Sequence, residues 1–94
     1  MRAYVYITAN KPHGVLYTGL TSELKYRITS HKTKKYENAF SARYNVDKLV
    51  YYETFNSIIT AQAREKQIKA GSRAKKIMLI ESMNPEWKDL YDTL

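Results

Sequence analysis

Residues 3–19 read AYVYITANKPHGVLYTG, and this stretch decides the fold. Ala3–Thr8 and Val15–Gly19 are rich in Tyr, Val and Ile, which favour β-strands. Between them, Pro and Gly in the segment 10–14 mark a turn that is too short to hold a helix. The stretch therefore predicts two antiparallel strands joined as a hairpin.

Two tyrosines are expected to meet on one side of this hairpin. Side chains alternate between the two faces of a strand, so Tyr6 shares a face with Tyr4 and Thr8. On the second strand, Tyr17 shares a face with Gly19. The pairing of the two strands then brings Tyr6 and Tyr17 to the same side of the sheet.

A first helix is predicted after the hairpin. Thr21 and Ser22 are favourable N-cap residues, and side chains at i, i+3, i+4 and i+7 spacing follow them. The side chains of this helical face are Leu24, Arg27, Ile28 and His31. The polar, basic segment 32–46 lacks a clear period and is expected to be irregular, with room for one helical turn.

One more strand and two more helices are predicted in the second half of the chain. Lys48–Phe55 has strand composition throughout. A helix over Ile58–Ala70 would be capped by Asn56-Ser57 and would end at Gly71. A third helix would begin after Ser72 and end before the proline at position 85.

The order of elements predicts an α+β fold, a small three-stranded antiparallel sheet flanked by helices. We expect one domain over residues 1–94, because 94 residues with 44% apolar composition suffice for one core and not for two. Residues 85–94 are expected to dock on this core as a short tail, because Trp87, Leu90 and Tyr91 fall at helical spacing.

The composition excludes several kinds of site. The chain has no cysteine and two histidines, so a disulfide framework, a thiolate zinc site, a cysteine nucleophile and a histidine-rich metal site are ruled out. A bound metal ion would have oxygen ligands, which points to Mg²⁺ or Mn²⁺.

The charge indicates a polyanionic partner. Sixteen Lys and Arg against nine Asp and Glu give a net charge of +7, which favours nucleic acid. The apolar stretches are far shorter than the roughly 18 residues of a membrane span. Because the first residues lack the pattern of a secretory signal, we expect a cytoplasmic protein without a membrane partner.

Five residues occur in an order that suggests a catalytic site. Tyr4-Val5-Tyr6 is followed after ten residues by Tyr17-Thr18-Gly19, then by Arg27 eight positions after the glycine, His31 four further on and Glu65 on a later helix. Each alone has a structural explanation, such as strand packing for a tyrosine or an exposed ion pair for a glutamate. The ordered set resembles the signature of the GIY-YIG nuclease superfamily.

The resemblance runs through Ile80 and includes small single-domain proteins similar to the nuclease domain of the bacterial excision-repair incision subunit. Segments 64–69, 72–76 and 84–87 are also typical of that group. It implies a metal-dependent endonuclease that acts on nucleic acid, DNA foremost, with a link to DNA repair.

The resemblance also implies a role for each residue of the set. Tyr6 would be the general base for water, with Tyr17 beside it to position the water and His31 as the natural proton acceptor. Arg27 would contact the scissile phosphate in bidentate fashion. Glu65 would hold a single magnesium or manganese ion. Gly19 would have a structural role, letting the backbone turn tightly into the first helix.

Two positions depart from the family pattern. Tyr4 stands where the family name has glycine, which leaves Tyr6 in place. Many relatives carry an asparagine about a dozen residues after the metal-binding glutamate, and here that position is Ile77, with Asn84 further on. The role of that asparagine is therefore not transferred to Asn84. This keeps an alternative open, a nucleic-acid-binding protein of the same fold with negligible cleavage activity.

Seven basic residues are predicted to contact phosphates: Lys32, Lys34, Lys35, Arg43, Arg73, Lys75 and Lys76. Their ordinary explanation is solvated surface charge. No base-reading module accompanies them, so binding is expected to be salt-sensitive and independent of sequence. Target recognition would come from a partner protein or from a homodimer. A third hypothesis, a protein-interaction module, rests on the exposed aromatic residues and the apolar tail near Trp87.

Overall fold

A three-stranded antiparallel sheet organises the chain. The computed structural model describes residues 2–33 and 44–94. The strands lie in the order β2-β1-β3, so β1 is central; they are β1 (Ala3–Ala9), β2 (Leu16–Thr21) and β3 (Lys48–Phe55). The predicted hairpin and the predicted third strand are thereby confirmed.

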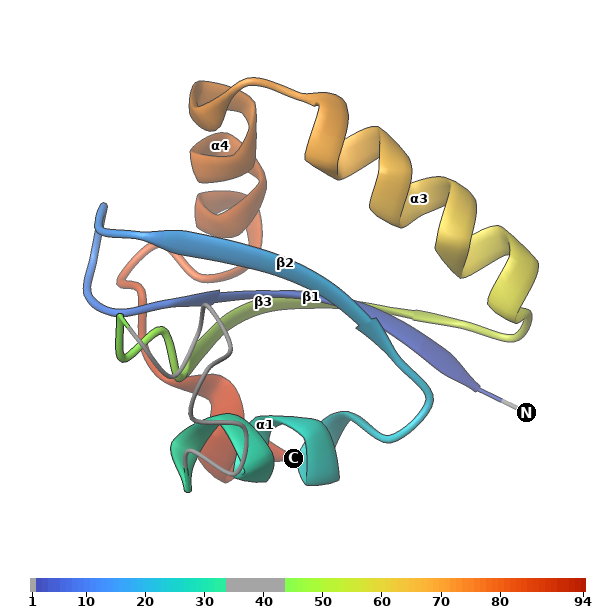
Figure 1. Ribbon diagram of the computed structural model, residues 1–94. Coiled ribbons are helices and arrows are strands. Elements are labelled where there is room, and N and C mark those ends of the chain that lie inside the picture. The colour runs from blue at the N-terminus through green and yellow to red at the C-terminus, as the bar shows by residue number, and fades with distance from the viewer. Residues whose placement is uncertain (1, 34–43) are drawn as a thin grey trace.

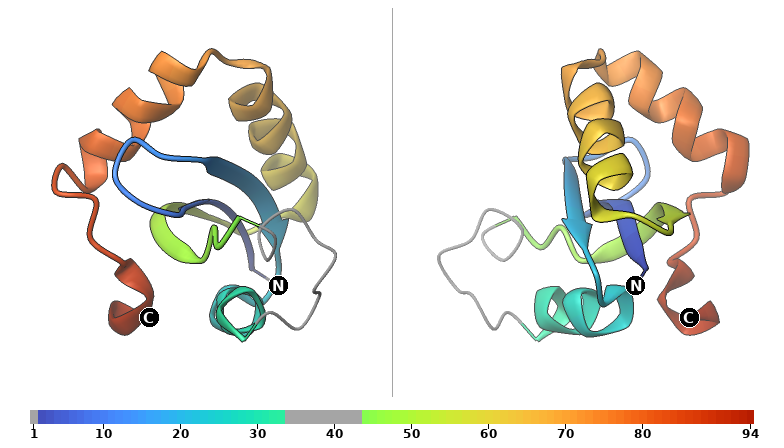
Figure 2. Two further views of the ribbon diagram at one scale, coloured as in Figure 1. Left: turned by 60° about the vertical axis from the view of Figure 1, so that its left-hand side comes forward. Right: turned by 90° about the vertical axis from the view of Figure 1, so that its right-hand side faces the viewer.

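Helices cover both faces of this sheet (Figures 1 and 2). α3 (Ile58–Ala70) and α4 (Arg73–Met83) lie on one face, whereas α1 (Leu24–Lys32) and the 3₁₀-helix η1 (Leu90–Thr93) lie on the other. This arrangement confirms the predicted α+β class. In the part of the chain that the structure describes, no helix has the length and apolarity needed to cross a bilayer.

The start of α1 differs from the prediction. β2 continues through Thr21, because Leu20 and Thr21 still pair with β1, so the strand does not end at Gly19. Consequently α1 begins later, with Glu23 at its N-cap and without a side-chain cap. The hydroxyl of Thr21 accepts the backbone N–H of Glu23 at 3.1 Å, which holds the strand-to-helix turn instead. The prediction that Thr21 or Ser22 caps α1 was wrong.

The other two helices begin as predicted. The Ser57 hydroxyl accepts the N–H of Ile59, and the Ser72 hydroxyl accepts the N–H of Lys75. Each bond satisfies a backbone donor that has no partner inside the helix, typically worth about 1 kcal/mol.

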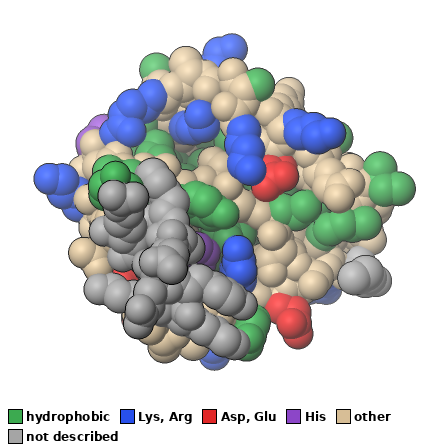
Figure 3. Space-filling model, viewed as in Figure 1, with side chains coloured by type: hydrophobic (Ala, Val, Ile, Leu, Met, Phe, Trp, Pro, Cys, Tyr) green, Lys and Arg blue, Asp and Glu red, His purple; other side chains and the backbone are tan. Residues whose placement is uncertain are grey.

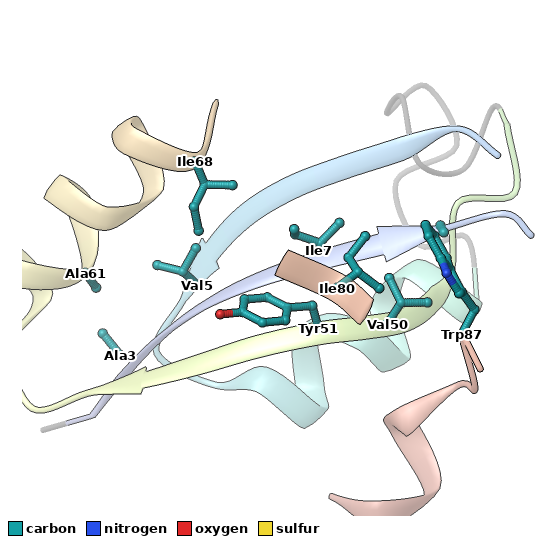
Figure 4. Packing of buried hydrophobic residues seen from close by; sticks show 10 residues of the cluster. Ala3, Val5, Ile7, Val50, Tyr51, Ala61, Ile68, Ile80 and Trp87 are labelled. Carbon is teal, nitrogen blue, oxygen red and sulfur yellow. The ribbon is translucent and has the colours of Figure 1, made fainter. Parts of the chain in front are cut away.

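The main core lies between the sheet and the α3–α4 face (Figure 4). Val5 and Ile7 of β1 are buried against Ile68 of α3 and Ile80 of α4. β3 adds a bulge at Val50, where the register with β1 shifts by one residue. Burial of such side chains contributes about 1.5–3 kcal/mol each, which makes this the dominant stabilising cluster.

The opposite face carries the tyrosines. Tyr6 is fully buried there with Leu24 and Ile28 of α1 and with Leu49 of β3. The alternation along β1 thus confirms the predicted division of the sheet into a Tyr6 face and a Val5 face.

The tail docks, but not as one helical face. Trp87 packs with the main core, while Leu90 and Tyr91 pack against the Tyr6 cluster on the other side of the sheet. The chain makes this passage around the edge strand β3, and Trp87 adopts a left-handed backbone with φ 57°. The spacing of these side chains predicts that they dock, but not that they contact two different clusters.

Candidate active site

The ring of Tyr6 reaches the edge of the sheet by lying over Gly19. The two residues are paired across β1 and β2, and a Cβ at position 19 would come within 2.4 Å of both Cζ and Oη of Tyr6. Only glycine leaves this space. Gly19 lies inside β2 and has no positive φ, so the expectation that it provides a tight turn into α1 was wrong; it accommodates the tyrosine ring.

Tyr6, Tyr17 and His31 form a triangle of rings. The ring centroids are 6.3 Å apart for Tyr6 and Tyr17, 5.9 Å for Tyr6 and His31 and 5.7 Å for Tyr17 and His31. The Tyr6 hydroxyl lies 3.2 Å from Nε2 of His31. The two tyrosines meet as the strand alternation predicted, and α1, the helix that follows β2, supplies the histidine.

His31 is in a state to accept a proton. It is buried, and burial is the main cause that lowers its pKa below the ordinary value, followed by the positive charge of Arg27. A neutral imidazole has one nitrogen without hydrogen. In the neutral tautomer that carries its hydrogen on Nδ1, Nε2 accepts a hydrogen bond from the Tyr6 hydroxyl, whereas in the other tautomer Nε2 donates it.

Arg27 lies one helical turn before His31 and faces the same hydroxyl. Its Nε donates to the Tyr6 oxygen over 3.4 Å, a long hydrogen bond. This bond is the largest cause of the raised pKa of Arg27, so the guanidinium keeps its charge at any physiological pH. The i, i+4 spacing of Arg27 and His31 on α1 thus directs two different groups at one oxygen.

Burial decides the state of the Tyr6 phenol. Desolvation raises the pKa of Tyr6 to about 12, although the hydrogen bond from Arg27 lowers it and the Glu65 carboxylate adds a small rise. The positive charge of Arg27 favours the phenolate, but burial outweighs it. Tyr6 is therefore a neutral phenol at neutral pH.

Glu65 lies on α3, which covers the opposite face of the sheet, and is near enough to Tyr6 for its charge to raise the pKa of the phenol. Its side chain is 19% exposed and pairs with Lys69 at 3.2 Å. Within residues 2–33 and 44–94, no three His, Asp or Glu side chains gather to surround a metal ion. One accessible carboxylate nevertheless suits Mg²⁺, which keeps several waters and takes one or two protein carboxylates plus substrate phosphates.

A basic groove of about 510 Å³ adjoins the tyrosines along β2. Its walls are the strand residues Val15, Leu16, Tyr17 and Thr18 and the helix residues Lys69, Arg73 and Lys76. Figure 3 shows Lys and Arg side chains gathered over the α3–α4 side of this face. Tyr17 belongs both to the ring triangle and to the groove, so the two features are continuous.

Comparison with protein-family models decides the family. The model described as the GIY-YIG catalytic domain matches residues 2–78, most of the chain and all of the site residues above. The chain belongs to the GIY-YIG family.

Several relatives carry only the label UPF0213 protein. This GIY-YIG chain is 39% identical to one from Syntrophus aciditrophicus over 83 residues, which cover 88% of this chain and 93% of the relative. It is 41% identical to one from Staphylococcus haemolyticus over 78 residues, which cover 83% and 93%. The solution NMR structure of a UPF0213 protein from Bacillus halodurans aligns with a TM-score of 0.59 at 29% identity, over 95% of this chain and 93% of that one.

The structure describes four of the seven predicted phosphate-binding residues of this GIY-YIG domain, Lys32, Arg73, Lys75 and Lys76. Arg73 and Lys76 line the basic groove, and Lys76 also lines a second groove between α3 and α4 together with Lys75. Lys32 is turned toward the tail, where it pairs with Asp89. The remaining three, Lys34, Lys35 and Arg43, lie outside the described residues.

Sequence reasoning missed Lys69 as a member of the site. Its ammonium contacts the carboxylate of Glu65 and lines the basic groove. The available signal was the spacing of four residues after Glu65, which places the two side chains together on one side of a helix.

Asn84 has a structural position in this GIY-YIG domain. The side chain is buried, and its amide donates to the carbonyls of Val50 and Lys88 while its oxygen accepts the N–H of Lys88. These hydrogen bonds tie Asn84 to the β3 bulge at Val50 and to the tail at Lys88. Ile77, at the position where many relatives have asparagine, packs against the main core.

Proposed function

We propose that this GIY-YIG chain is a metal-dependent endonuclease, one nuclease domain over residues 1–94, which hydrolyses phosphodiester bonds of nucleic acid and acts on DNA foremost. One observation carries the proposal: a single buried phenol oxygen, that of Tyr6, lies within hydrogen-bond distance of both a neutral imidazole and a guanidinium. Structural packing alone does not require this combination.

The first step is activation of water through Tyr6 and His31. As the water oxygen attacks phosphorus, the Tyr6 oxygen takes a proton from the water and its own proton moves to Nε2 of His31. Because the pKa of Tyr6 is about 12, only about one molecule in 10⁵ would carry a phenolate at pH 7. Transfer to His31 removes the need to accumulate that phenolate.

Arg27 would stabilise the negative charge that develops on the phosphate during the reaction. As the water oxygen attacks phosphorus, negative charge builds on the phosphate oxygens, and the leaving oxygen takes the electron pair of the bond that breaks. The permanently charged, fork-shaped guanidinium suits a bidentate contact with two of them. Tyr17, the third member of the ring triangle, would position the water.

Glu65 would hold the magnesium or manganese ion. When bound, such an ion supplies Lewis-acid stabilisation of phosphate and leaving oxygens. The single carboxylate leaves the remaining ligand positions to water and to the substrate.

The basic groove would carry the nucleic-acid backbone away from the site. Lys69, Arg73 and Lys76 are cations without a base-reading element, so affinity should be salt-sensitive and independent of sequence. Target choice would then come from a partner protein or from a second copy of the chain. The proposal includes a cytoplasmic location and a part in DNA repair.

Cleavage of labelled single-stranded, duplex, nicked, branched and RNA substrates with Mg²⁺ or Mn²⁺ tests the proposal. The natural protein should cut at least one of them, and Tyr6→Phe and Glu65→Gln should lower the rate by at least about 100-fold. Tyr4→Phe on the same face of β1 and Glu86→Gln in the exposed tail are the matched controls and should cut normally. Binding without metal-dependent cleavage would favour the alternative, a nucleic-acid-binding protein.

A further inference from the structure

The ammonium of Lys69 lies at the carboxylate proposed to hold the metal ion. Lys69 Nζ is 3.2 Å from Oε2 of Glu65, one helical turn earlier on α3. The Lys69 side chain is 54% exposed and that of Glu65 is 19% exposed. A cation at this oxygen opposes the approach of a second cation, because their charges repel at short distance.

The three cations of the basic groove differ in what holds them. Arg73 donates to two carbonyls of the hairpin turn at 2.6 Å each, and Lys76 donates at 3.0 Å to the carbonyl just after α3. These two side chains are held by backbone carbonyls, which have no part in the proposed reaction. The partner that the structure gives Lys69 is instead Glu65, a side chain with a proposed role of its own.

We propose that Lys69 exchanges Glu65 for a phosphate of the bound nucleic acid, and that nucleic-acid binding thereby frees the carboxylate for the metal ion. The inference rests on the proposed function, because it needs a metal at Glu65 and a polyanion in the groove. An i, i+4 ion pair on a helix surface is weak when its lysine is largely exposed, so it opposes the exchange little. The lysine has a flexible four-carbon stem and already lines the groove.

This exchange makes the bindings of metal ion and nucleic acid cooperative. By thermodynamic linkage, the factor by which nucleic acid raises the affinity for the metal ion equals the factor by which the metal ion raises the affinity for nucleic acid. The free protein would bind the ion weakly until a substrate occupies the groove. Lys69 is then a positioning residue, because it acts through Glu65 and not on the reacting atoms.

Metal affinity without nucleic acid gives the first test. Mn²⁺ is titrated into ¹⁵N-labelled protein, and paramagnetic broadening of the α3 amide signals near Glu65 gives the dissociation constant. Lys69→Met should bind Mn²⁺ tighter by a factor on the order of three to ten, because a neighbouring positive charge and an ion pair are lost. Lys66→Met removes the same charge one residue from Glu65, at an exposed position of the same helix, and should change the constant less than about twofold.

Nucleic-acid affinity without metal gives the second test. With EDTA present, a labelled oligonucleotide is titrated at several salt concentrations, and log affinity is plotted against log salt. Lys69→Met should bind more weakly and lower the magnitude of the slope by about 0.7 to 0.9, the share of one phosphate contact. Lys66→Met should leave the slope unchanged.

The outcomes separate this inference from the proposed function. Equal Mn²⁺ constants for Lys69→Met and Lys66→Met, with broadening centred on Glu65, would overturn the exchange and leave the metal site intact. An unchanged salt slope in Lys69→Met would likewise overturn it. Broadening that misses Glu65 in all three proteins would overturn the exchange together with the proposed metal site.

Discussion

The Tyr6 ring occupies the space that a side chain at position 19 would fill, since a Cβ on Gly19 would lie 2.4 Å from the Tyr6 hydroxyl oxygen. Gly19→Ala must therefore displace the ring or the strand. We expect it to lower the free energy of unfolding by about 1–3 kcal/mol, the usual cost of overpacking. It should also lower the cleavage rate of the folded protein, because the hydroxyl moves away from His31.

Gly71→Ala is the matched control for this substitution. A Cβ at Gly71 would lie 3.3 Å from the carbonyl of Ile68, and the backbone has an ordinary φ of −74°. Its free energy of unfolding should stay within about 1 kcal/mol of the natural protein. Urea denaturation of both variants measures the difference. Equal stability and equal cleavage for Gly19→Ala and the natural protein would refute the packing role of Gly19.

Asn84 should be needed for stability and not for catalysis. Its buried amide holds the carbonyl of Val50 at the β3 bulge and both backbone groups of Lys88. Asn84→Ala leaves these groups without partners, so we expect a loss of about 2–3 kcal/mol in the free energy of unfolding. Cleavage per folded molecule should be unchanged. Asn56→Ala, at an exposed position before α3, is the control for both measurements.

Local patterns in the sequence predicted much of the fold. Some features depend only on residues that are close together in the sequence. These are the hairpin, the strand Lys48–Phe55 and the helix caps Ser57 and Ser72. The contact of Tyr6 with Tyr17 follows from strand alternation and antiparallel pairing. These features need no knowledge of distant segments.

Other features depend on contacts between distant segments and were missed. The space at Gly19 exists because of a ring from another strand, and composition gives no sign of it. The passage of the tail around β3 depends on Trp87 and Leu90 finding different cores, although their spacing suits one helix face. The Tyr6 phenol is neutral because burial raises its pKa, and this burial arises only when the distant segments pack together.

Alkaline conditions should reveal the buried phenol of Tyr6. An unfolded tyrosine loses its proton near pH 10, whereas burial raises the pKa of Tyr6 to about 12. Between these values the folded state binds more protons, so its stability falls as the pH rises. Tyr6 should account for about 2 kcal/mol of that loss. Urea denaturation between pH 9 and 12 should show a shallower fall for Tyr6→Phe.

Tyr51 provides an independent check of the same effect. Burial is also the main cause that raises its pKa to about 12, with its hydrogen bond to Glu53 next. Tyr51→Phe should remove its own share of the alkaline loss, and the double variant should lose both shares. Parallel declines for the natural protein and Tyr6→Phe would contradict the burial of an ionisable phenol at the site.

Acid conditions should test the proton acceptor. Burial and then Arg27 lower the pKa of His31 below its ordinary value of about 6.5. Folding therefore favours the neutral ring. The contribution of this ring to the free energy of unfolding is lost as the pH falls from about 6.5 to below the lowered pKa of the folded protein. In the proposed mechanism a protonated His31 cannot accept the Tyr6 proton, so cleavage should fall over the same range, tenfold per pH unit at the acid end.

The NMR titration of the His31 ring links this rate profile to one residue. Its midpoint should lie below pH 6.5. It should coincide with the acid limb of kcat/KM, measured at nucleic-acid concentrations well below saturation, because kcat/KM reports the free enzyme. Arg27→Met removes the second cause of the shift, so the midpoint should rise toward 6.5 even though catalysis is weakened. An acid limb centred above pH 6.5, or a His31 midpoint that does not respond to Arg27→Met, would show that a group other than His31 receives the proton.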